Sequence, residues 1–316
     1  MKVGFIGLGN VGGKLSGSLI RNGVAVAVHD LNVDFVAAKV AAGAEDGKSA
    51  ANLMATCDAV ITCLPNPAAS DAVMQEMLPE VGPGKIWMEM STTDEAEVKR
   101  IGAMVIERGG EAVDCPVSGG CHRADTGNIS IFAGCERTTF ERILPLLTTM
   151  GRRVLHTGPI GSASVLKVIT NYLATANLVS CAEALTVAKG ANIDLGLAYE
   201  AIAISSGTSF VHETESQVIL NGSRDISFTM DLVAKDIGLF QEVADRAQVP
   251  LQLNPLLIDI FQDGINRYGP RELSPNIIKR LEDATGLDIR APGFPPEMVD
   301  TEPEEPGAEV VPKSHT

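Results

Sequence analysis

The sequence has few of the features that mark secreted, metal-binding, membrane or nucleic-acid-binding proteins. Its six cysteines form no C-x-x-C pair and no Cys/His spacing resembles a zinc site, so we expect free thiols, a reducing compartment and no metal. No stretch offers about 18 uninterrupted apolar residues, so no membrane helix is expected. Lys and Arg number 25 against 40 Asp and Glu, and the net charge of −15 disfavours nucleic acid and anionic membranes as partners. Because the letters MKVGFIGLG enter a strand at once, we expect no signal peptide and a cytoplasmic protein.

Two kinds of apolar segment alternate along the first half of the chain. Strand-like runs such as KVGFIG, VAVAVHD, CDAVITCLP and GKIWMEMS are separated by helical patterns such as GGKLSGSLIRNG and TDEAEVKRIGAMVIERG. The segment EAVDCPVSGG begins as a strand and ends in a loop, and NISIFAG and RRVLHTG add two more strands. This alternation predicts an α/β fold with an open, doubly wound and mostly parallel sheet in residues 1–161.

The second half of the chain changes character twice. Helical periodicity predicts an all-helical domain over residues 162–290 that begins with one long helix. Buried helix faces need partners, so we expect a homodimer or a homotetramer. The last 26 residues, 291–316, hold six prolines and six acids against one lysine, and this composition predicts a disordered acidic tail.

A glycine-rich turn stands between the first expected strand and the first expected helix. It reads G-x-G-x-x-G and consists of Gly7, Leu8, Gly9, Asn10, Val11 and Gly12. Such glycines let the backbone approach a pyrophosphate, while the helix N-terminus supplies N–H donors, so we predict a dinucleotide-binding domain of the Rossmann type.

Asp30, at the end of the second expected strand, bears on the choice of dinucleotide. A carboxylate at this position accepts hydrogen bonds from the adenosine ribose hydroxyls and repels a 2′-phosphate. The next residues, Leu31 and Asn32, offer no arginine to hold such a phosphate. We therefore predict NAD as the cofactor rather than NADP; the alternative for Asp30 is a capping or turn aspartate.

Five segments in order along the chain resemble the β-hydroxyacid dehydrogenase family. They are GFIGLGNVG, ITCLPN, DCPVSGG, GSASVLKVITN and AKDIGL, and they span about residues 3–240. The resemblance implies a Rossmann-type domain followed by a helical domain. It also implies hydride transfer between NAD(P) and a small 3-hydroxy acid or its semialdehyde, either 3-hydroxyisobutyrate-like or 2-hydroxy-3-oxopropionate-like.

The resemblance also implies a role for residues at matching positions. Lys167 is implied to be the catalytic lysine. The residues implied to hold the substrate are Ser118, Gly119, Gly120 and Asn171, and those implied to contact the cofactor are Leu64, Pro65, Thr92 and, from the helical domain, Lys235. The sequence departs from the family pattern at Val11, where methionine is usual, and at Thr170, where asparagine is frequent.

Lys167 also stands out without the resemblance. It lies four residues before Asn171 among apolar neighbours, so the two side chains leave one face of a helix one turn apart. When a carbonyl is reduced, an ammonium can stabilise the charge that develops on oxygen and donate its proton; in oxidation the neutral amine takes a proton. Desolvation should lower the pKa of Lys167 towards working pH. The alternative is a structural lysine that snorkels to the surface or pairs with a distant carboxylate.

Other interpretations stay open at this point. Arg123 follows the substrate segment and could grip a second anionic group on the substrate, or could be a solvated loop cation. An imine reductase shares this architecture but generally lacks the catalytic lysine. A non-catalytic NAD-binding protein would have no use for a buried lysine at that place.

Overall fold

The computed structural model describes residues 1–313 and divides the chain into two compact units. The first unit contains Met1–Lys167 and the C-terminal segment from Asp300, and the second contains Val168–Val299. The chain therefore leaves the first unit, builds the second, and returns to the first.

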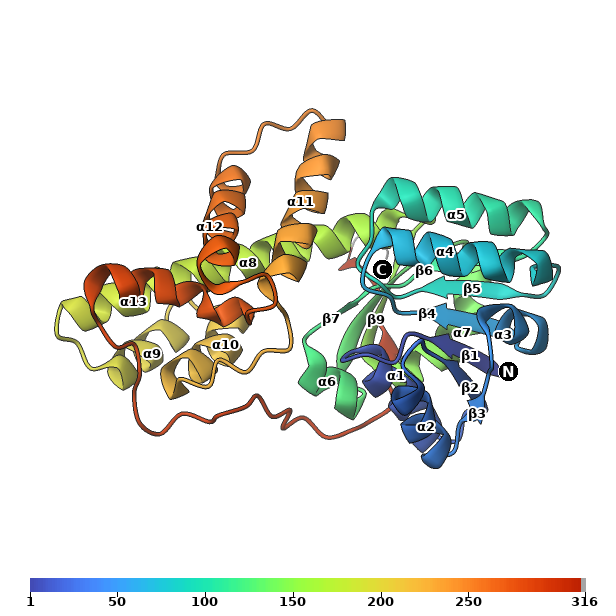
Figure 1. Cartoon of the computed structure of the whole chain (residues 1–316), viewed down its shortest axis with the longest axis horizontal. Coiled ribbons are helices and arrows are strands. Elements are labelled where there is room, and N and C mark those ends of the chain that lie inside the picture. The colour runs from blue at the N-terminus through green and yellow to red at the C-terminus, as the bar shows by residue number, and fades with distance from the viewer. Residues whose placement is uncertain (314–316) are drawn as a thin grey trace. The chain divides into compact units, whose positions relative to one another are not determined.

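One sheet organises the first unit (Figure 1). Its strands follow the order β10-β9-β8-β6-β5-β4-β1-β2-β3, with β7 paired to β8 off this path. The neighbours from β3 to β6 all pair in parallel, whereas β8 runs antiparallel to β6. The strands are β1 (Val3–Ile6), β2 (Val26–His29), β3 (Glu45–Asp46), β4 (Ala59–Thr62), β5 (Ile86–Glu89), β6 (Glu111–Asp114), β7 (Val117–Ser118), β8 (Ile129–Gly134), β9 (Gly151–Gly158) and β10 (Ala308–Glu309).

Helices cover both faces of this sheet. On β4, Ile61 joins a buried cluster with α1 and α7, while its neighbour Val60 joins a second cluster with α3, α4 and α5. Strands buried on both faces are what a doubly wound fold requires, and the predicted fold class is confirmed. The helices of this unit are α1 (Gly12–Arg21), α2 (Val33–Ala41), α3 (Ala50–Thr56), α4 (Pro67–Met77), the 3-10 turn η1 (Leu78–Glu80), α5 (Glu95–Glu107), α6 (Cys121–Thr126) and α7 (Arg137–Met150).

The carboxyl ends of the parallel strands meet at one edge of the sheet. Ile6 pairs in register with His29 on one side and with Thr62 on the other, and Thr62, Glu89 and Asp114 continue the row. The loops that follow these strands therefore emerge side by side. In open α/β sheets, ligands bind at this edge.

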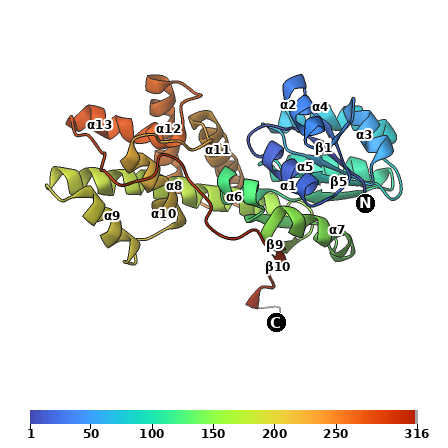
Figure 2. The same ribbon diagram turned by 90° about the horizontal axis from the view of Figure 1, so that it is seen from below.

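The second unit is built along one long helix. The helix α8 (Ser162–Gly190) begins in the first unit, and Figure 2 shows the remaining helices of the second unit arranged along it. Their shared core includes Leu185, Phe261 and Ile278, all fully buried. The elements are α9 (Leu195–Ala203), α10 (Phe210–Asn221), α11 (Met230–Arg246), α12 (Leu253–Tyr268), the 3-10 turn η2 (Ser274–Ile278) and α13 (Lys279–Thr285).

Helix α8 is long and apolar enough to cross a membrane by length and composition alone. The sequence predicts no membrane helix, because no stretch of it is apolar without interruption. Core helices of water-soluble proteins pass the same test, and the core side of α8 packs against the other helices of the second unit. The absence of a membrane partner stays a prediction.

The expectation of a disordered acidic tail is wrong for residues 300–313, which we call the C-terminal strap. Ala308 and Glu309 form β10 and extend the sheet in parallel beside β9. The Gly307 N–H donates to the Thr148 carbonyl at 2.9 Å, and the Val310 N–H donates to the Val154 carbonyl at 2.8 Å. Residues 314–316, which the predicted tail included, lie outside the described residues.

Candidate functional site

The glycine turn between β1 and α1 is packed tightly on one side and open on the other. A Cβ at Gly12 would lie 2.0 Å from the Gly7 carbonyl oxygen, and one at Gly7 would lie 2.2 Å from the Cys63 oxygen. A Cβ at Gly9 would meet no atom within 4 Å. A cavity of about 270 Å³ borders the turn at Leu8, Gly9 and Asn10. The backbone of the turn therefore leaves room for a ligand at Gly9 and nowhere for side chains at Gly7 or Gly12.

The N-terminus of α1 is suited to an anion. Val11 occupies the N-cap position without a side-chain hydrogen bond, and the first turn of the helix contains no acidic residue. The positive end of the helix dipole is therefore not neutralised by a carboxylate of that turn. Together with the open space at Gly9, this geometry fits a dinucleotide pyrophosphate.

Asp30 follows β2 and is bound to the turn. Its Oδ2 accepts a hydrogen bond from the Leu8 N–H at 2.6 Å, and its Oδ1 accepts one from the Asn32 N–H at 2.8 Å. The bond from Asn32 is of the kind that a turn aspartate makes, which was the alternative interpretation of Asp30. The bond to Leu8, however, holds the acid beside the glycine turn, where a ribose hydroxyl would approach it.

The loops after β4 and β5 are joined by a buried acid. Glu89, at the end of β5, is 1% exposed, and its Oε1 accepts hydrogen bonds from the N–H and the hydroxyl of Ser91. The Ser91 hydroxyl oxygen in turn accepts the Leu64 N–H at 2.7 Å. Burial raises the pKa of Glu89, and the bonds from Ser91 oppose that rise. Leu64, Pro65 and Thr92, the predicted cofactor contacts, all lie in the two loops that this network holds together.

The predicted substrate segment lies at the edge of the sheet. Ser118 ends β7, and Gly119 and Gly120 follow with φ values of +128° and +88°, a backbone region that suits glycine. Gly120 is the N-cap of α6 and has no side chain to cap it. A hydroxyl and consecutive N–H groups at a helix start can bind a carboxylate.

The sequence interpretation placed Arg123 in a loop, but in the structure it belongs to α6. Its Nη2 donates to Glu302 Oε1 of the strap at 2.9 Å, and its side chain is 21% exposed. The aliphatic part of Arg123 lies against the substrate segment, because a Cβ at Gly119 would be 3.4 Å from Arg123 Cδ. The guanidinium therefore has a carboxylate partner from the protein itself.

Lys167 lies in the second turn of α8 and is 8% exposed. The start of this helix is fixed by Asp114, at the end of β6. Asp114 Oδ1 accepts the Gly161 N–H at 2.8 Å, and Oδ2 accepts the Ser164 N–H at 2.7 Å. Burial raises the pKa of Asp114, and these hydrogen bonds oppose that rise. The lysine thus stands on a helix whose N-terminus is held at the carboxyl edge of the sheet.

One turn further along α8, Asn171 takes part in a polar cluster of the second unit. Its Nδ2 donates to Asp236 Oδ2 at 2.5 Å, and Lys235 Nζ lies 2.8 Å from Asp236 Oδ1. Asp236 is 2% exposed. The structure therefore brings two predicted site residues, Asn171 and Lys235, to one carboxylate that the sequence interpretation did not single out. The motif AKDIGL did contain it.

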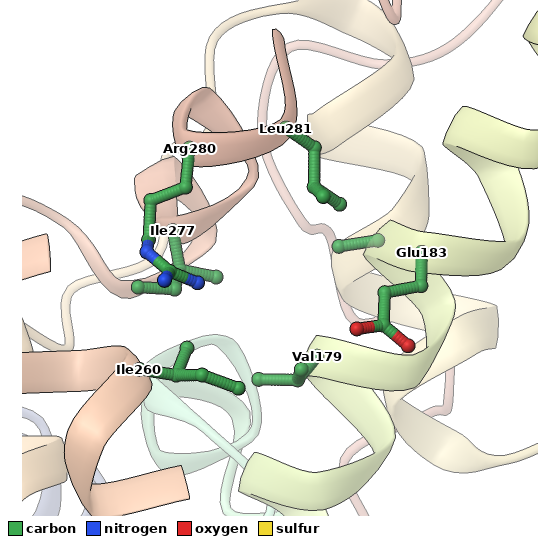
Figure 3. Close-up of a pocket in the computed structure, with 7 residues that line it drawn as sticks. Val179, Glu183, Ile260, Ile277, Arg280 and Leu281 are labelled. Atoms are coloured by element: carbon green, nitrogen blue, oxygen red, sulfur yellow. The ribbon is translucent and has the colours of Figure 1, made fainter. Parts of the chain in front are cut away.

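A second hollow, in the helical unit, is too small to compete as a substrate site (Figure 3). It encloses about 20 Å³, which is room for about one water molecule. Figure 3 shows Glu183 and Arg280 at its rim and the apolar side chains of Val179, Ile260 and Leu281 between them. Among residues 1–313, no group of three or more His, Cys, Asp or Glu side chains could hold a metal ion, and all six cysteines are free.

Comparisons with known proteins agree with this geometry. Residues 2–158 match the family model described as the NAD binding domain of 6-phosphogluconate dehydrogenase. Residues 161–281 match the one described as the NAD-binding domain of NADP-dependent 3-hydroxyisobutyrate dehydrogenase.

Individual proteins align over most of the chain. A 2-(hydroxymethyl)glutarate dehydrogenase of Eubacterium barkeri is 32% identical over 92% of this chain and 97% of its own length. An NAD-dependent L-serine dehydrogenase of Pseudomonas aeruginosa is 30% identical over 90% of this chain and 98% of its own. The crystal structure of a 3-hydroxyisobutyrate dehydrogenase from Salmonella typhimurium superposes with a TM-score of 0.80, is 27% identical, and covers 89% of this chain and 99% of that one. The chain therefore belongs to the β-hydroxyacid dehydrogenase family, whose members here are dehydrogenases of hydroxy acids built on an NAD(P)-binding fold.

Proposed function

We propose that this protein transfers a hydride between NAD and a small 3-hydroxy acid or its semialdehyde, with Lys167 as the general acid and base. The substrate we favour is 3-hydroxyisobutyrate-like or 2-hydroxy-3-oxopropionate-like. The observation that carries the proposal is a buried lysine on a helix whose start Asp114 ties to the carboxyl edge of the sheet. Titratable groups that move protons in enzymes are often partly removed from water in this way, so a buried lysine at this edge fits that role.

Several contacts support NAD as the cofactor. The open space at Gly9 and the uncapped start of α1 fit the pyrophosphate, as described above. Asp30, held by the Leu8 N–H, would accept the ribose hydroxyls and repel a 2′-phosphate. Leu64, Pro65 and Thr92 lie in loops of the same edge. The family resemblance implies Lys235 as a further cofactor contact.

Each site residue has a separate role in the proposed hydride transfer. The Ser118 hydroxyl and the N–H groups of Gly119 and Gly120 would bind the substrate carboxylate and orient the alcohol. Bound NAD supplies the acceptor for the hydride. In oxidation, the neutral amine of Lys167 takes the proton of the substrate hydroxyl, and in reduction its ammonium returns that proton to the developing alkoxide. Asn171 would donate to the same oxygen region from one turn further along α8.

We also propose an oligomer in the cytoplasm. Large apolar side chains of the second unit are strongly exposed: Val187 on α8 is 70% exposed, Leu197 on α9 is 64% exposed and Ile204 after α9 is 88% exposed. A homodimer or homotetramer would cover such side chains. The net charge of −15 supports a protein that binds neither nucleic acid nor anionic membrane.

The test is a screen of small 3-hydroxy acids with NAD and NADP in parallel, followed by nicotinamide absorbance, on the wild type and on Lys167→Ala. We expect NAD-linked oxidation in the wild type, and a loss of kcat by a factor on the order of 10²–10⁴ in the variant. The wild-type rate should increase with pH, because only the neutral amine accepts the proton. Tight NAD binding without turnover of any hydroxy acid would favour the non-catalytic alternative.

Equal rates in both proteins would remove Lys167 from the mechanism. Reduction of cyclic imines by the wild type, with no oxidation of hydroxy acids, would point to the imine reductase alternative instead. NAD affinity, measured separately on both proteins, controls for loss of fold in the variant.

A further inference from the structure

Helix α6 depends on contacts with the rest of the protein for its position. It has only six residues, its N-cap Gly120 provides no side-chain hydrogen bond, and Ala124 is its one buried residue. A helix this short is not stable by itself in water. Yet it follows Gly119 and Gly120 directly, so any shift of α6 shifts the segment that we propose to hold the substrate carboxylate.

The C-terminal strap, residues 300–313, supplies such contacts at the far end of α6. Asn128, just past the helix, is fully buried, and its Nδ2 donates to Asp300 Oδ2 at 2.7 Å and to the Glu302 carbonyl at 3.0 Å. The Thr126 hydroxyl also donates to Asp300 Oδ2. Burial would raise the pKa of Asp300, but these hydrogen bonds, a bond from the Glu302 N–H and the charge of Arg123 together hold that pKa below its usual range. The acid is therefore charged at neutral pH and bound by two donors of the α6 region.

The side chain of Glu302 makes a further contact, and this contact leads back to the substrate segment. Its carboxylate accepts from the Arg123 guanidinium at 2.9 Å, and the stem of Arg123 lies against Gly119. The glycine at 119 is needed there, since its φ of +128° disfavours any side chain. A continuous row of contacts therefore joins the strap to the substrate segment: Glu302 to Arg123, and Arg123 to Gly119.

We propose that Asp300 and Glu302 are positioning residues for the substrate-carboxylate segment, acting through α6. This inference rests on the proposed function of Ser118–Gly120. The two family models match residues 2–158 and 161–281, and the strap lies beyond both stretches. The contacts of Asp300 and Glu302 are therefore an addition to the parts that those models describe. Asp125 of α6 lines the cavity at Gly9, whereas Arg123, the partner of Glu302, lies against Gly119. We therefore expect Asp300 and Glu302 to affect the hydroxy acid more strongly than NAD.

The experiment compares two double variants of the full-length protein. Asp300→Ala with Glu302→Ala removes the side-chain contacts of these two acids to the α6 region and keeps the bond to the Glu302 carbonyl. Glu305→Ala with Glu309→Ala is the matched control: it removes the same charge from the same strap, but these acids pair with Arg152 and Arg137, outside α6. Steady-state kinetics on each would give kcat and the KM values for the hydroxy acid and for NAD.

We expect the first variant to raise KM for the hydroxy acid about tenfold, equivalent to about 1.4 kcal/mol of lost binding, with the KM for NAD and the kcat within about twofold of wild type. The control should leave all three parameters unchanged. An equal rise in both variants, an equal rise in the KM for NAD, or no rise at all would overturn the proposal, because each would mean that α6 is not held specifically by Asp300 and Glu302.

A second measurement separates this inference from the proposed function. Amide hydrogen exchange of residues 118–131 in the protein without substrate reports the order of α6 directly. Faster exchange in the Asp300→Ala, Glu302→Ala variant alone would support the positioning role even if no hydroxy acid were turned over, in which case only the proposed function fails. Exchange equal to wild type would overturn the inference whatever the activity.

Discussion

The glycine turn offers the sharpest test of how this protein accommodates a dinucleotide, because its glycines differ in the space around them. We consider the two substitutions Gly9→Ala and Gly12→Ala, which make the same chemical change three residues apart. At Gly12 the new Cβ would stand 2.0 Å from the Gly7 carbonyl oxygen, so the start of α1 must move away from the turn. At Gly9 it would meet nothing within 4 Å.

The expected effects on stability therefore have opposite signs. Overpacking at a closed position costs typically about 1–3 kcal/mol, so Gly12→Ala should lower the melting temperature. Gly9 does not adopt a positive φ, so alanine fits its backbone, and restricting the unfolded chain should stabilise the protein by about 0.4–1 kcal/mol. The effects on cofactor binding should not follow stability. Alanine at Gly9 occupies the space that the pyrophosphate would use, and we expect NAD to bind at least about tenfold more weakly.

The assay pairs calorimetric melting with titration of NAD on the same preparations. Gly82→Ala is the control, because a Cβ there also meets no atom within 4 Å but lies far along the chain from the turn. A folded Gly9→Ala protein that binds NAD like the wild type would refute the inferred position of the pyrophosphate. A Gly12→Ala protein with unchanged melting would refute the packing argument.

Three further predictions follow from single features. Asp30→Ala removes the carboxylate that repels a 2′-phosphate, so the ratio of kcat/KM for NAD to that for NADP should fall about tenfold or more; an unchanged ratio in steady-state assays would argue against the ribose contact. Burial raises the pKa of Glu215 from an ordinary value of 4.5 to about 7. Between these two pH values the folded protein keeps a proton that the unfolded chain has lost. The stabilisation present below pH 4.5 is therefore lost as the pH rises through about 7. Glu215→Gln should therefore gain stability over the wild type between those two pH values, by at most about 3 kcal/mol above pH 7; melting curves whose difference does not depend on pH would contradict this. Sedimentation of the wild type should give a dimer or tetramer, and a monomer at all concentrations would sink the proposed oligomer.

The main strands and the long helices could be predicted from the sequence, because their signals are local. Each parallel strand is a short apolar run bounded by turn residues, and α5 begins with acids in its first turn after the cap Asp94. Three short or irregular elements were missed: α3 has seven residues, α6 begins and ends at glycines, and α7 contains Pro145 in its interior. In each of them tertiary packing outweighs a weak or contrary local signal.

Contacts between residues far apart in the chain could not be predicted from the sequence. Asp236 was passed over because its partner Asn171 lies 65 positions away, and nothing in the spacing of either motif predicts that they meet. The acidic composition of the tail predicted disorder for the same reason. Its carboxylates would repel one another in isolation, but Glu302, Glu305 and Glu309 each find an arginine of the first unit.

Carboxylates at the ends of parallel strands explain how the loops of the site are held before any ligand binds. Loop N–H groups that lie past the ladder of strand hydrogen bonds need another acceptor. Asp30 accepts the Leu8 N–H after β1, Glu89 accepts the Ser91 N–H after β5, and Asp114 accepts the N–H groups that begin α8, the helix of Lys167. An acid just after β2 and acids at the ends of β5 and β6 thus each fix a segment that carries a proposed site residue. Replacing such an acid by its amide would turn an acceptor pair into an acceptor and a donor, so we expect loop order, and with it ligand affinity, to suffer before the sheet itself loses stability.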